Sequence, residues 1–473
     1  MKTNNKRLFL LSALIAGLNL IPAGRVTAQT FTVLHGFTPT VVIDNGNFTF
    51  GFTNSDGVRP NGGLITNSSG TILYGTASQG GNSYNGTVFA VNTDGTGFTN
   101  LHNFTALTSN TNSDGAGPYA GLVLSGNMLY GTAAGGGSSG AGTVFALNTD
   151  GTGFTNLHSF AVVDYGSNPY TNSDGAGPGG LILSGNTLYG TAGRGGSAGA
   201  GTVFRLNADG TGFTNLYIFS PLNYDSASPT AEDTNSDGAW PNAGLILSGN
   251  TLYGTASRGG SAGNGTVFAL NTDGTGFTNL HSFAAGVLID FGQTFVNSEG
   301  VRPKAGLILL GNTLYGTAFT GGSSGSGTLF ALDTDGTAFT NLYTFTPLNY
   351  DSASPFGART NREGAMPNAG LLLSGNTLYG TASGGGSGGN GTLFSLSFRP
   401  QLAIAPSGTN VILSWPISFA GFNYTGYQLQ DTTDLGSPAG WSVPDPFPPI
   451  IVNGQYRVTR PMLGPQRSYR LVQ

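Results

Sequence analysis

The apolar and polar positions of this chain follow one pattern that returns six times. Each copy contains the string Leu-Tyr-Gly-Thr-Ala, and fifteen residues after its tyrosine comes a phenylalanine in Gly-Thr-Val-Phe or Gly-Thr-Leu-Phe. A Gly-Leu segment such as residues 121–124 precedes this string, and a segment such as residues 154–160 follows the phenylalanine. Short apolar segments between turn residues are typical of β-strands. Each copy therefore predicts four strands, named A, B, C and D in chain order. The six tyrosines are Tyr74, Tyr130, Tyr189, Tyr253, Tyr315 and Tyr379.

The links between these segments favour hairpins. Ser-Gly-Asn joins A to B in four copies, and Asp-Gly joins C to D in five. Both sequences tolerate the positive φ angles that tight hairpin turns require. Strand C is apolar at consecutive positions, as in residues 144–147, which indicates that both faces of its sheet are covered. The pattern thus predicts four-stranded sheets stacked face to face.

The count of segments predicts how the sheets close. There are six A, B and C segments, but only five D segments follow them, because the sixth copy runs from Phe394 into a different sequence. Residues 31–37, near the N-terminus, match the D segment at 154–160. A closed ring explains this split, since the first strand would complete the last sheet and remove its free edge. We expect an all-β fold, a six-bladed β-propeller closed by the N-terminal strand; an open stack or β-helix is the alternative.

The first 28 residues predict export. Lys2, Lys6 and Arg7 precede an apolar run at residues 8–20, and a Val-Thr-Ala cleavage pattern ends at Ala28. This is the layout of a signal peptide, with a retained membrane anchor as the alternative. No later apolar run is long enough to span a membrane, so we expect no transmembrane segment after cleavage and a secreted or cell-surface location.

The repeat region is expected at residues 29–399, and a second domain at 400–473. Past Pro400 the glycine-rich rhythm stops, and a strand with Trp415 is followed by one with Tyr427. This order resembles a fibronectin type III or immunoglobulin-like sandwich, so we expect a small C-terminal β-sandwich.

The repeats at 31–397 resemble the GloVer tandem-repeat family of bacterial exported proteins. The likeness is carried by Leu-Tyr-Gly-Thr-Ala, the following Gly-Gly, and Gly-Thr-Val-Phe, in all six copies. The resemblance implies a secreted or cell-surface role and transfers no catalytic residue. At a coarser level the repeats look kelch-like, although the paired Gly and Trp pattern of kelch repeats is not met.

Composition removes several classes of function. The chain has no cysteine, which excludes disulfides, thiolate metal sites and a lipoprotein anchor. Its net charge is −5, and its 17 Lys and Arg residues are scattered along the sequence, which argues against nucleic acid as a partner.

An acidic residue precedes strand A in every copy. If strand A lies nearest the ring axis, these carboxylates could form a ring that holds a cation or polar ligand, whereas the simpler interpretation is a turn. Residues 233–238 resemble the start of a calcium loop, but Gly244 stands where the bidentate glutamate is needed. We expect no cofactor, with calcium as the weak alternative. The six residues are Asp56, Asp114, Asp174, Asp237, Glu299 and Glu363.

The histidines all fall at one place in strand D. They are His35, His102, His158 and His281, and the remaining copies carry Tyr217 and Tyr343 there. Because tyrosine replaces histidine freely, we expect a half-exposed strand position and neither a metal site nor a catalytic one.

The D-to-A loops differ most among the copies and carry the candidate ligand-binding residues. Variable loops on a rigid scaffold commonly bind ligands, and exposed aromatic rings beside acids suit sugars; the alternative is that the loops only fill space. We expect a monomeric, non-enzymatic binding or adhesion scaffold for an extracellular glycan or surface protein. A hydrolase or lyase using the acidic ring is disfavoured because similar repeats supply similar environments; a purely structural surface protein is the other alternative. The loop residues are Tyr165, Tyr170, Tyr224, Asp225, Phe291, Tyr350 and Asp351.

Overall fold

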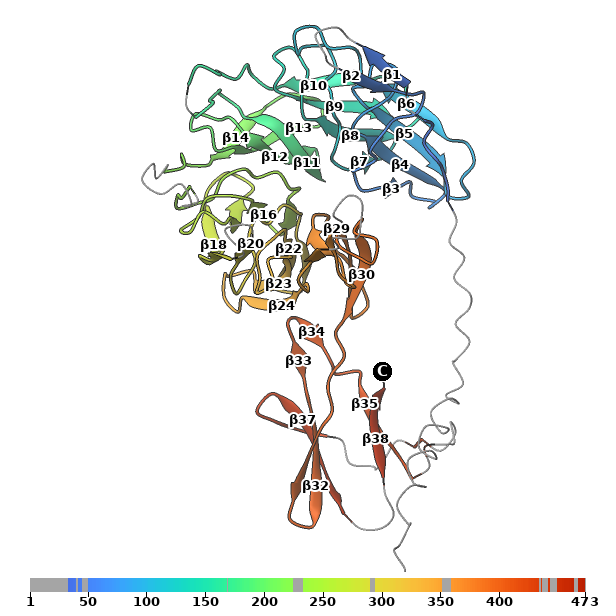
Figure 1. The fold of residues 1–473 in the computed structure, drawn as a ribbon, viewed down its shortest axis with the longest axis vertical. Helices are drawn as coiled ribbons and strands as arrows, with labels where there is room; N and C mark the ends of the chain where they lie inside the picture. Colours follow the sequence, from blue (N-terminus) through green and yellow to red (C-terminus); the bar gives the residue numbers. More distant parts are fainter. Residues whose placement is uncertain are drawn as a thin grey trace, which may run out of the picture.

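The computed structural model describes residues 33–39, 41–44, 50–167, 169–223, 233–289, 294–350, 359–433, 435, 441–442, 449–462 and 467–472. The expected signal peptide and Phe31 lie outside these ranges. Across the described residues the regular structure consists of β-strands (Figure 1). None of the described residues forms a helix long and apolar enough to cross a membrane.

Five antiparallel sheets contain four strands each, in the predicted order A-B-C-D. The first contains β3 (Ile65–Thr66), β4 (Ile72–Ala77), β5 (Thr87–Asn92) and β6 (Thr99–Asn103). The second contains β7 (Val123–Ser125), β8 (Met128–Ala133), β9 (Thr143–Asn148) and β10 (Thr155–Ser159). The third contains β11 (Ala176–Ser184), β12 (Thr187–Arg194), β13 (Thr202–Asn207) and β14 (Thr214–Ile218). The fourth contains β15 (Ile246–Ser248), β16 (Thr251–Ala256), β17 (Thr266–Asn271) and β18 (Thr278–Ser282), and the fifth β21 (Ile308–Leu310), β22 (Thr313–Ala318), β23 (Thr328–Asp333) and β24 (Thr340–Thr344).

The sixth sheet differs at both edges. Its strand A is divided into β27 (Ala365–Pro367) and β28 (Leu372–Ser374), which both pair with β29 (Thr377–Gly384). Strand C is β30 (Thr392–Ser397), which pairs with β29 and with no other strand of the described chain. The predicted pairing of residues 31–37 with β30 is therefore not among the described strand pairs, and ring closure stays a prediction.

A glycine opposite a phenylalanine fixes the spacing between strands B and C. In the fourth sheet Gly254 of β16 is the cross-strand partner of Phe268 of β17, and the same pair occurs in the other five sheets. A Cβ at Gly254 would lie 2.5 Å from Phe268 Cζ and 2.8 Å from Leu245 Cδ2. The ring occupies the space of the missing side chain, which explains why glycine interrupts an apolar strand.

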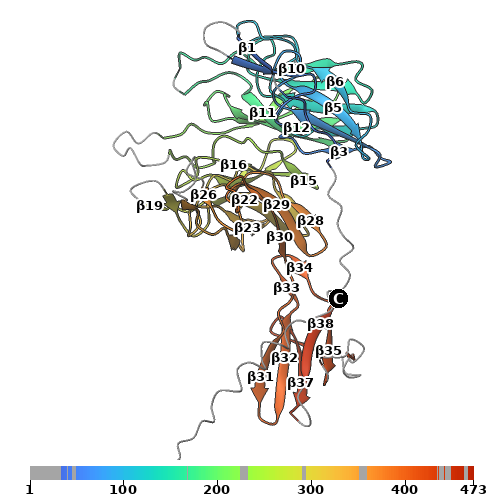
Figure 2. The same cartoon turned by 45° about the vertical axis from the view of Figure 1, so that its right-hand side comes forward.

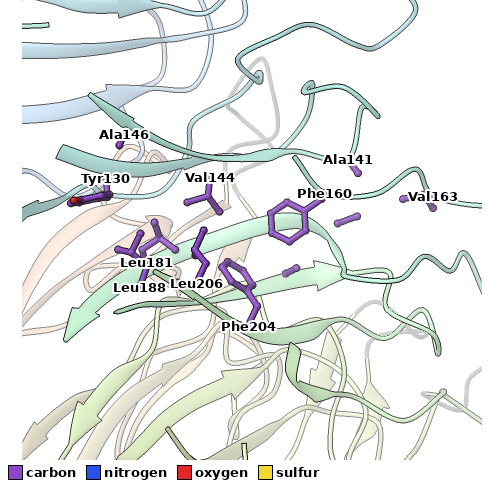
Figure 3. Close-up of a cluster of buried hydrophobic side chains, with 12 residues drawn as sticks. Tyr130, Ala141, Val144, Ala146, Phe160, Val163, Leu181, Leu188, Phe204 and Leu206 are labelled. Atoms are coloured by element: carbon purple, nitrogen blue, oxygen red, sulfur yellow. The ribbon is translucent and has the colours of Figure 1, made fainter. Parts of the chain in front are cut away.

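The hydrophobic core lies between successive sheets. Figure 3 shows Val144 and Phe160 of the second repeat packed towards Leu181, Leu206 and Phe204 of the third. The rings of Phe160 and Phe204 meet edge to face at 5.3 Å, and equivalent pairs join the other repeats. Hydrogen bonds also join successive repeats. Thr132 Oγ1 of the second repeat donates to Gly179 O of the third at 2.7 Å. Each junction thus buries the phenylalanine of one strand D against strand C of the next repeat.

The C-terminal part extends from the repeats as a stalk (Figures 1 and 2). One sheet has the order β31 (Ala403–Ser407), β32 (Asn410–Pro416), β37 (Gln455–Pro461), β36 (Ile450–Val452), and a second pairs β35 (Gln428–Thr432) with β38 (Ser468–Val472). Leu413 and Trp415 of the first sheet share a core with Leu429 of the second. The two sheets agree with a compact β-domain, while its finer likeness to fibronectin type III domains stays a prediction.

A hairpin of the C-terminal part packs against the repeats. It consists of β33 (Ser418–Phe419) and β34 (Phe422–Asn423). The side chains of Phe422 and Tyr424 are buried in one cluster with Tyr315 of the fifth repeat, whose hydroxyl donates a hydrogen bond to Ala420 O. The hairpin therefore attaches the stalk to the repeat region.

Substitution of Gly254 by alanine tests the glycine–phenylalanine register. The new methyl group would overlap Phe268, so we expect a loss of about 1–3 kcal/mol in the free energy of unfolding, measured by urea denaturation. Gly388→Ala is the control, because the nearest atom to a Cβ there is 3.8 Å away. Equal midpoints for the two variants would contradict the packing described here.

Candidate functional site

The six acidic residues before strand A each bond to the strand D that precedes them. Asp114 Oδ2 accepts from His102 Nε2 at 2.9 Å and from the Thr105 backbone N–H at 3.0 Å. Four histidines and two tyrosines thus share one role, which explains why the two residue types interchange. We call these pairs the D–A clamps. They are His35–Asp56, His102–Asp114, His158–Asp174, Tyr217–Asp237, His281–Glu299 and Tyr343–Glu363.

An aromatic ring holds five of the six clamps from the other side. His102 stacks on Phe154, the first residue of the following D segment, with ring centroids 3.8 Å apart and planes 10° apart. The same stack joins Tyr217 to Phe277 at 3.8 Å. The imidazole or phenol ring is therefore fixed between a carboxylate and a phenylalanine. This is the environment of a structural contact between repeats.

The electrostatics of three clamps favour the ionised carboxylate, at Asp56, Asp114 and Glu363. Burial alone would raise the pKa of Asp114, but hydrogen bonds from His102 and Thr105 outweigh burial and hold the pKa below its ordinary value. The Tyr343 hydrogen bond lowers the pKa of Glu363. On the other side of that pair, burial and then Glu363 raise the pKa of Tyr343 to about 12.

An asparagine two residues before each acid braces the loops around it. Asn112 Nδ2 donates to Thr105 O at 2.9 Å and to Gly115 O at 2.7 Å. Its Oδ1 accepts from the backbone N–H of Gly115 at 2.9 Å and of Gly137 at 2.8 Å. One amide thus ties together the end of strand D, the start of strand A and the B-to-C loop.

The structure places the predicted acidic residues at equivalent positions, but each carboxylate contacts its own strand D. The described residues contain no group of three or more His, Asp or Glu that could hold a metal ion. At the loop considered for calcium, Asp237 accepts hydrogen bonds from Tyr217 and Ser220. These contacts favour the turn and clamp role, and ligand binding by the acidic residues stays a prediction.

The D-to-A loops rise from short two-stranded stems. β1 (Val41–Asp44) pairs with β2 (Phe50–Thr53), β19 (Val287–Ile289) with β20 (Thr294–Val296), and β25 (Asn349–Tyr350) with β26 (Arg359–Thr360). Single bridges close the other three stems, as Asp164 with Thr171. The variable loops therefore begin and end at fixed points above the clamps.

Two of the predicted binding residues come together on one loop. Tyr165 is 72% exposed and Tyr170 is 56% exposed, and their rings meet edge to face at 5.3 Å. Tyr224, Asp225, Phe291 and Asp351 lie outside the described residues, and only the backbone of Tyr350, in β25, is described. Among the predicted binding residues that the structure describes, Tyr165 and Tyr170 are the two whose aromatic rings contact each other.

A second exposed apolar feature was missed by sequence reasoning. Val287, Leu288 and Ile289 of β19 are all exposed in the loop between the fourth and fifth repeats. The sequence does contain a signal for this feature, because three branched apolar residues in a row are unusual in a loop that is otherwise polar. Exposed apolar residues thus occur in at least two D-to-A loops.

The fold and the clamps define an all-β tandem-repeat protein whose repeats are joined by one recurring contact. Residues 25–232 match the Gloeobacter/Verrucomicrobia repeat family, which supports the expected GloVer repeats over this part of the chain. No curated protein matches the sequence.

Similar solved structures share little sequence with this chain. A putative 6-phosphogluconolactonase from Bacteroides uniformis ATCC 8492 has 13% identity and a TM-score of 0.40, covering 90% of this chain and 92% of that one. A putative TolB from Agrobacterium tumefaciens has 10% identity and a TM-score of 0.34, covering 72% and 90%. A nidogen/laminin complex chain has 16% identity and a TM-score of 0.35, covering 60% and 79%. At these identities and TM-scores, the similar structures give no evidence about the function of this chain.

Asp114→Asn tests the clamp. The neutral amide weakens the bond to His102, so we expect a loss of about 1–3 kcal/mol in the free energy of unfolding at pH 7. The folded-state pKa of Asp114 is lowered, so its contribution is full above the ordinary value of 3.8 and is lost as pH falls below it. The difference between wild type and variant, measured by urea denaturation, should shrink over that acid range. Asp150→Asn, in an exposed turn, is the control, and an equal loss there would contradict the clamp.

Proposed function

We propose that this protein is an exported binding scaffold whose six repeats close into a ring and present the D-to-A loops as a ligand-binding face. The observation that carries the proposal is the contrast between the junctions and the loops. The same clamp occurs at every D-to-A step, whereas the loops above it differ in length and expose apolar side chains. Rigid support below variable loops is the arrangement that many binding proteins use.

The exposed tyrosines suggest the type of ligand. Tyr165 and Tyr170 present ring faces and hydroxyl groups together, at little cost in side-chain entropy because tyrosine has few rotatable bonds. Sugars combine apolar ring faces with hydroxyl groups, so an extracellular glycan is the ligand class we favour. The enzyme alternative has less support, because the acidic residues have similar internal partners in every repeat.

The double variant Tyr165→Ala with Tyr170→Ala tests glycan binding. On a glycan array, we expect the mature wild-type protein to bind a subset of glycans and the double variant to lose at least tenfold in signal on that subset. The matched control is Val162→Ala, which changes a 69% exposed residue of the same loop. Unchanged binding by the double variant would reject the aromatic pair, and no binding by wild type would favour a purely structural protein.

Ring closure is supported by two incomplete surfaces at the ends of the repeat array. In the sixth repeat Tyr379 is 40% exposed and Leu393 is 78% exposed, whereas the equivalent residues of the five other repeats are buried. In the first repeat Leu64 is 56% exposed, and its equivalents in the other repeats are also buried. The trailing face of the last repeat and the leading face of the first are thus the two halves of the junction found between all other repeats.

A cavity at the sixth sheet has the lining of a phenylalanine site. It measures about 250 Å³, and its walls include Tyr343, Phe345 and Phe394. In the preceding repeat the corresponding space holds Phe339, which stacks on His281 at 3.9 Å and on Phe330 at 5.6 Å. By alignment with the D segments, Phe31 is the residue that would fill this cavity.

The N-terminal segment makes half of the contacts of a strand D. His35 Nε2 lies 2.9 Å from Asp56 Oδ2, its ring stacks on Phe98 at 3.6 Å, and Phe37 contacts Phe89 at 5.6 Å. These are the contacts that the strands D of the first four repeats make with the following repeat. The other half would be backbone pairing with a strand C, and β30 is the strand C that has this edge free in the described chain.

A disulfide can trap this pairing. In the first repeat Thr99 is the cross-strand partner of Ala90. If residues 31–37 pair with β30 in the same register, Thr32 would face Ser395. The chain has no cysteine, so Thr32→Cys with Ser395→Cys introduces the only pair. On non-reducing gels we expect an internally crosslinked monomer, with about 2–4 kcal/mol more stability than its reduced form.

The control for crosslinking is Thr155→Cys with Ser395→Cys, because Thr155 already pairs with Ala146 in the second sheet. We expect no internal bond there. Disulfide-linked dimers of the first variant would assign the sixth sheet to a second copy of the chain. An absence of any crosslink would show that the ends stay apart.

A further inference from the structure

Four cationic side chains that are scattered in the sequence gather where the third, fourth and fifth repeats meet. The Arg258 guanidinium carbon lies 4.3 Å from the centre of the Trp240 ring, and that of Arg194 lies 5.8 Å from it. Arg258 also acts electrostatically on Lys304, as does Arg302. We call these four cations, with Trp240, the cationic cluster.

Strand ends of neighbouring repeats position the cluster. Arg194 is the last residue of β12, and Arg258 follows β16, where it forms a bridge with Ala239. The Trp240 carbonyl accepts from the Ser257 backbone N–H at 3.2 Å, which holds the tryptophan beside the end of that strand. Strand B ends and strand A begins here, so the cluster lies at the end of the sheets that the D-to-A loops enter. Figures 1 and 2 both show β12, β16 and β22 following one another through these repeats.

The backbone beneath the cluster carries conformational strain. Trp240 has φ 60° and Arg302 has φ 58°, in the left-handed region that costs a residue with a Cβ about 1 kcal/mol or more. The equivalent residues of the second and third repeats are Gly117 and Gly177, which adopt φ 68° and 62° without that cost. Glycine therefore suits this backbone, yet the four other repeats place a side chain there at φ 58–60°. These residues are Arg59, Trp240, Arg302 and Met366.

Three cations of the cluster, Arg194, Arg258 and Lys304, lack nearby carboxylates in the described chain. Among the described residues, no carboxylate lies within 4 Å of the side-chain nitrogens of Arg194, Arg258 or Lys304. Lys304 is half-buried, with its ammonium 3.7 Å from the centre of the Phe319 ring. Burial first, and then the repulsion of Arg302 and Arg258, lower the pKa of Lys304. Lys304 and Arg258 thus repel each other, although the chain has a net charge of −5.

We propose that the cationic cluster is a binding site for an anion that presents carboxylate or phosphate oxygens, such as an acidic sugar or a phosphate group. A guanidinium offers a planar pair of donors to such oxygens, and Lys304 adds a point charge beside them. The contact with the Trp240 ring restrains the Arg258 guanidinium, which reduces the entropy lost on binding. The site is separate from Tyr165 and Tyr170 and does not depend on neutral glycan binding by that pair.

Calorimetric titration of the mature protein tests the site with three probes: trigalacturonate, inorganic phosphate and neutral maltotriose. We expect saturable binding of at least one anion, no heat from maltotriose, and weaker affinity as sodium chloride rises. Arg258→Gln and Lys304→Gln should each weaken the anion at least tenfold. Arg205→Gln is the matched control, because it removes a cation on β13, outside the cluster, and it should leave the affinity unchanged. The tighter anion identifies whether the site prefers a carboxylated sugar or phosphate.

Thermal unfolding separates binding from a structural role. Without anion, Lys304→Gln should melt at or above the wild-type temperature, because the substitution relieves repulsion. With the bound anion, the wild-type temperature should rise and that of the variant should not. Absence of saturable binding for both anions, or an equal loss of affinity in Arg205→Gln, would overturn the proposal. So would a lower melting temperature of Lys304→Gln without anion, since it would make the cation a structural element.

Discussion

In the repeat region the phenylalanine of each strand D is buried against the next repeat, and the rest of that region depends on this constraint. Phe160 of one strand D packs on Phe204 of the following strand C, while Thr132 donates to a carbonyl of the same neighbour. Stability is then a sum of junctions between nearest neighbours, as in other repeat proteins. The ends of such an array always carry two unmatched halves of a junction. Here they are the exposed Leu64 and the exposed Leu393.

The clamps decide where function can lie. Every residue type that looks chemical in the repeating pattern (His, Asp and Asn) has an internal partner at the junctions, as His102, Asp114 and Asn112 do. Repetition in this chain therefore marks structure. We therefore look for binding where the repeats depart from their own pattern, in the D-to-A loops and at the strand end that carries Trp240.

The sequence predicted correctly those elements that depend on residues close together in the chain. The fixed offset between the Leu-Tyr-Gly-Thr-Ala tyrosine and the Gly-Thr-Val-Phe phenylalanine implies one B–C register in all copies, and Gly254 opposite Phe268 shows that register. Partners across a variable loop were out of reach: His102 and Asp114 are 12 residues apart, and His35 and Asp56 are 21 apart. The two residues were interpreted separately, although they form one hydrogen bond. Aligning the copies would have shown that Trp240 stands where two other repeats have Gly117 and Gly177. The reason why glycine suits this position, a positive φ angle, comes from the structure.

The cationic cluster shows that net charge does not describe the local charge at every part of this chain. Only 8% of the residues are charged, so the placement of a few side chains sets the local potential. The six acids before strand A are held in or beside the clamps, where histidine, tyrosine or backbone N–H groups bind them. They therefore do not neutralise Arg194, Arg258 and Lys304, which lie where strand B ends or strand A begins. A net charge of −5 still argues against a long polyanion such as DNA, whose binding needs an extended basic surface. It does not argue against a small anion, because such a ligand meets only the few cations within reach of its own oxygens.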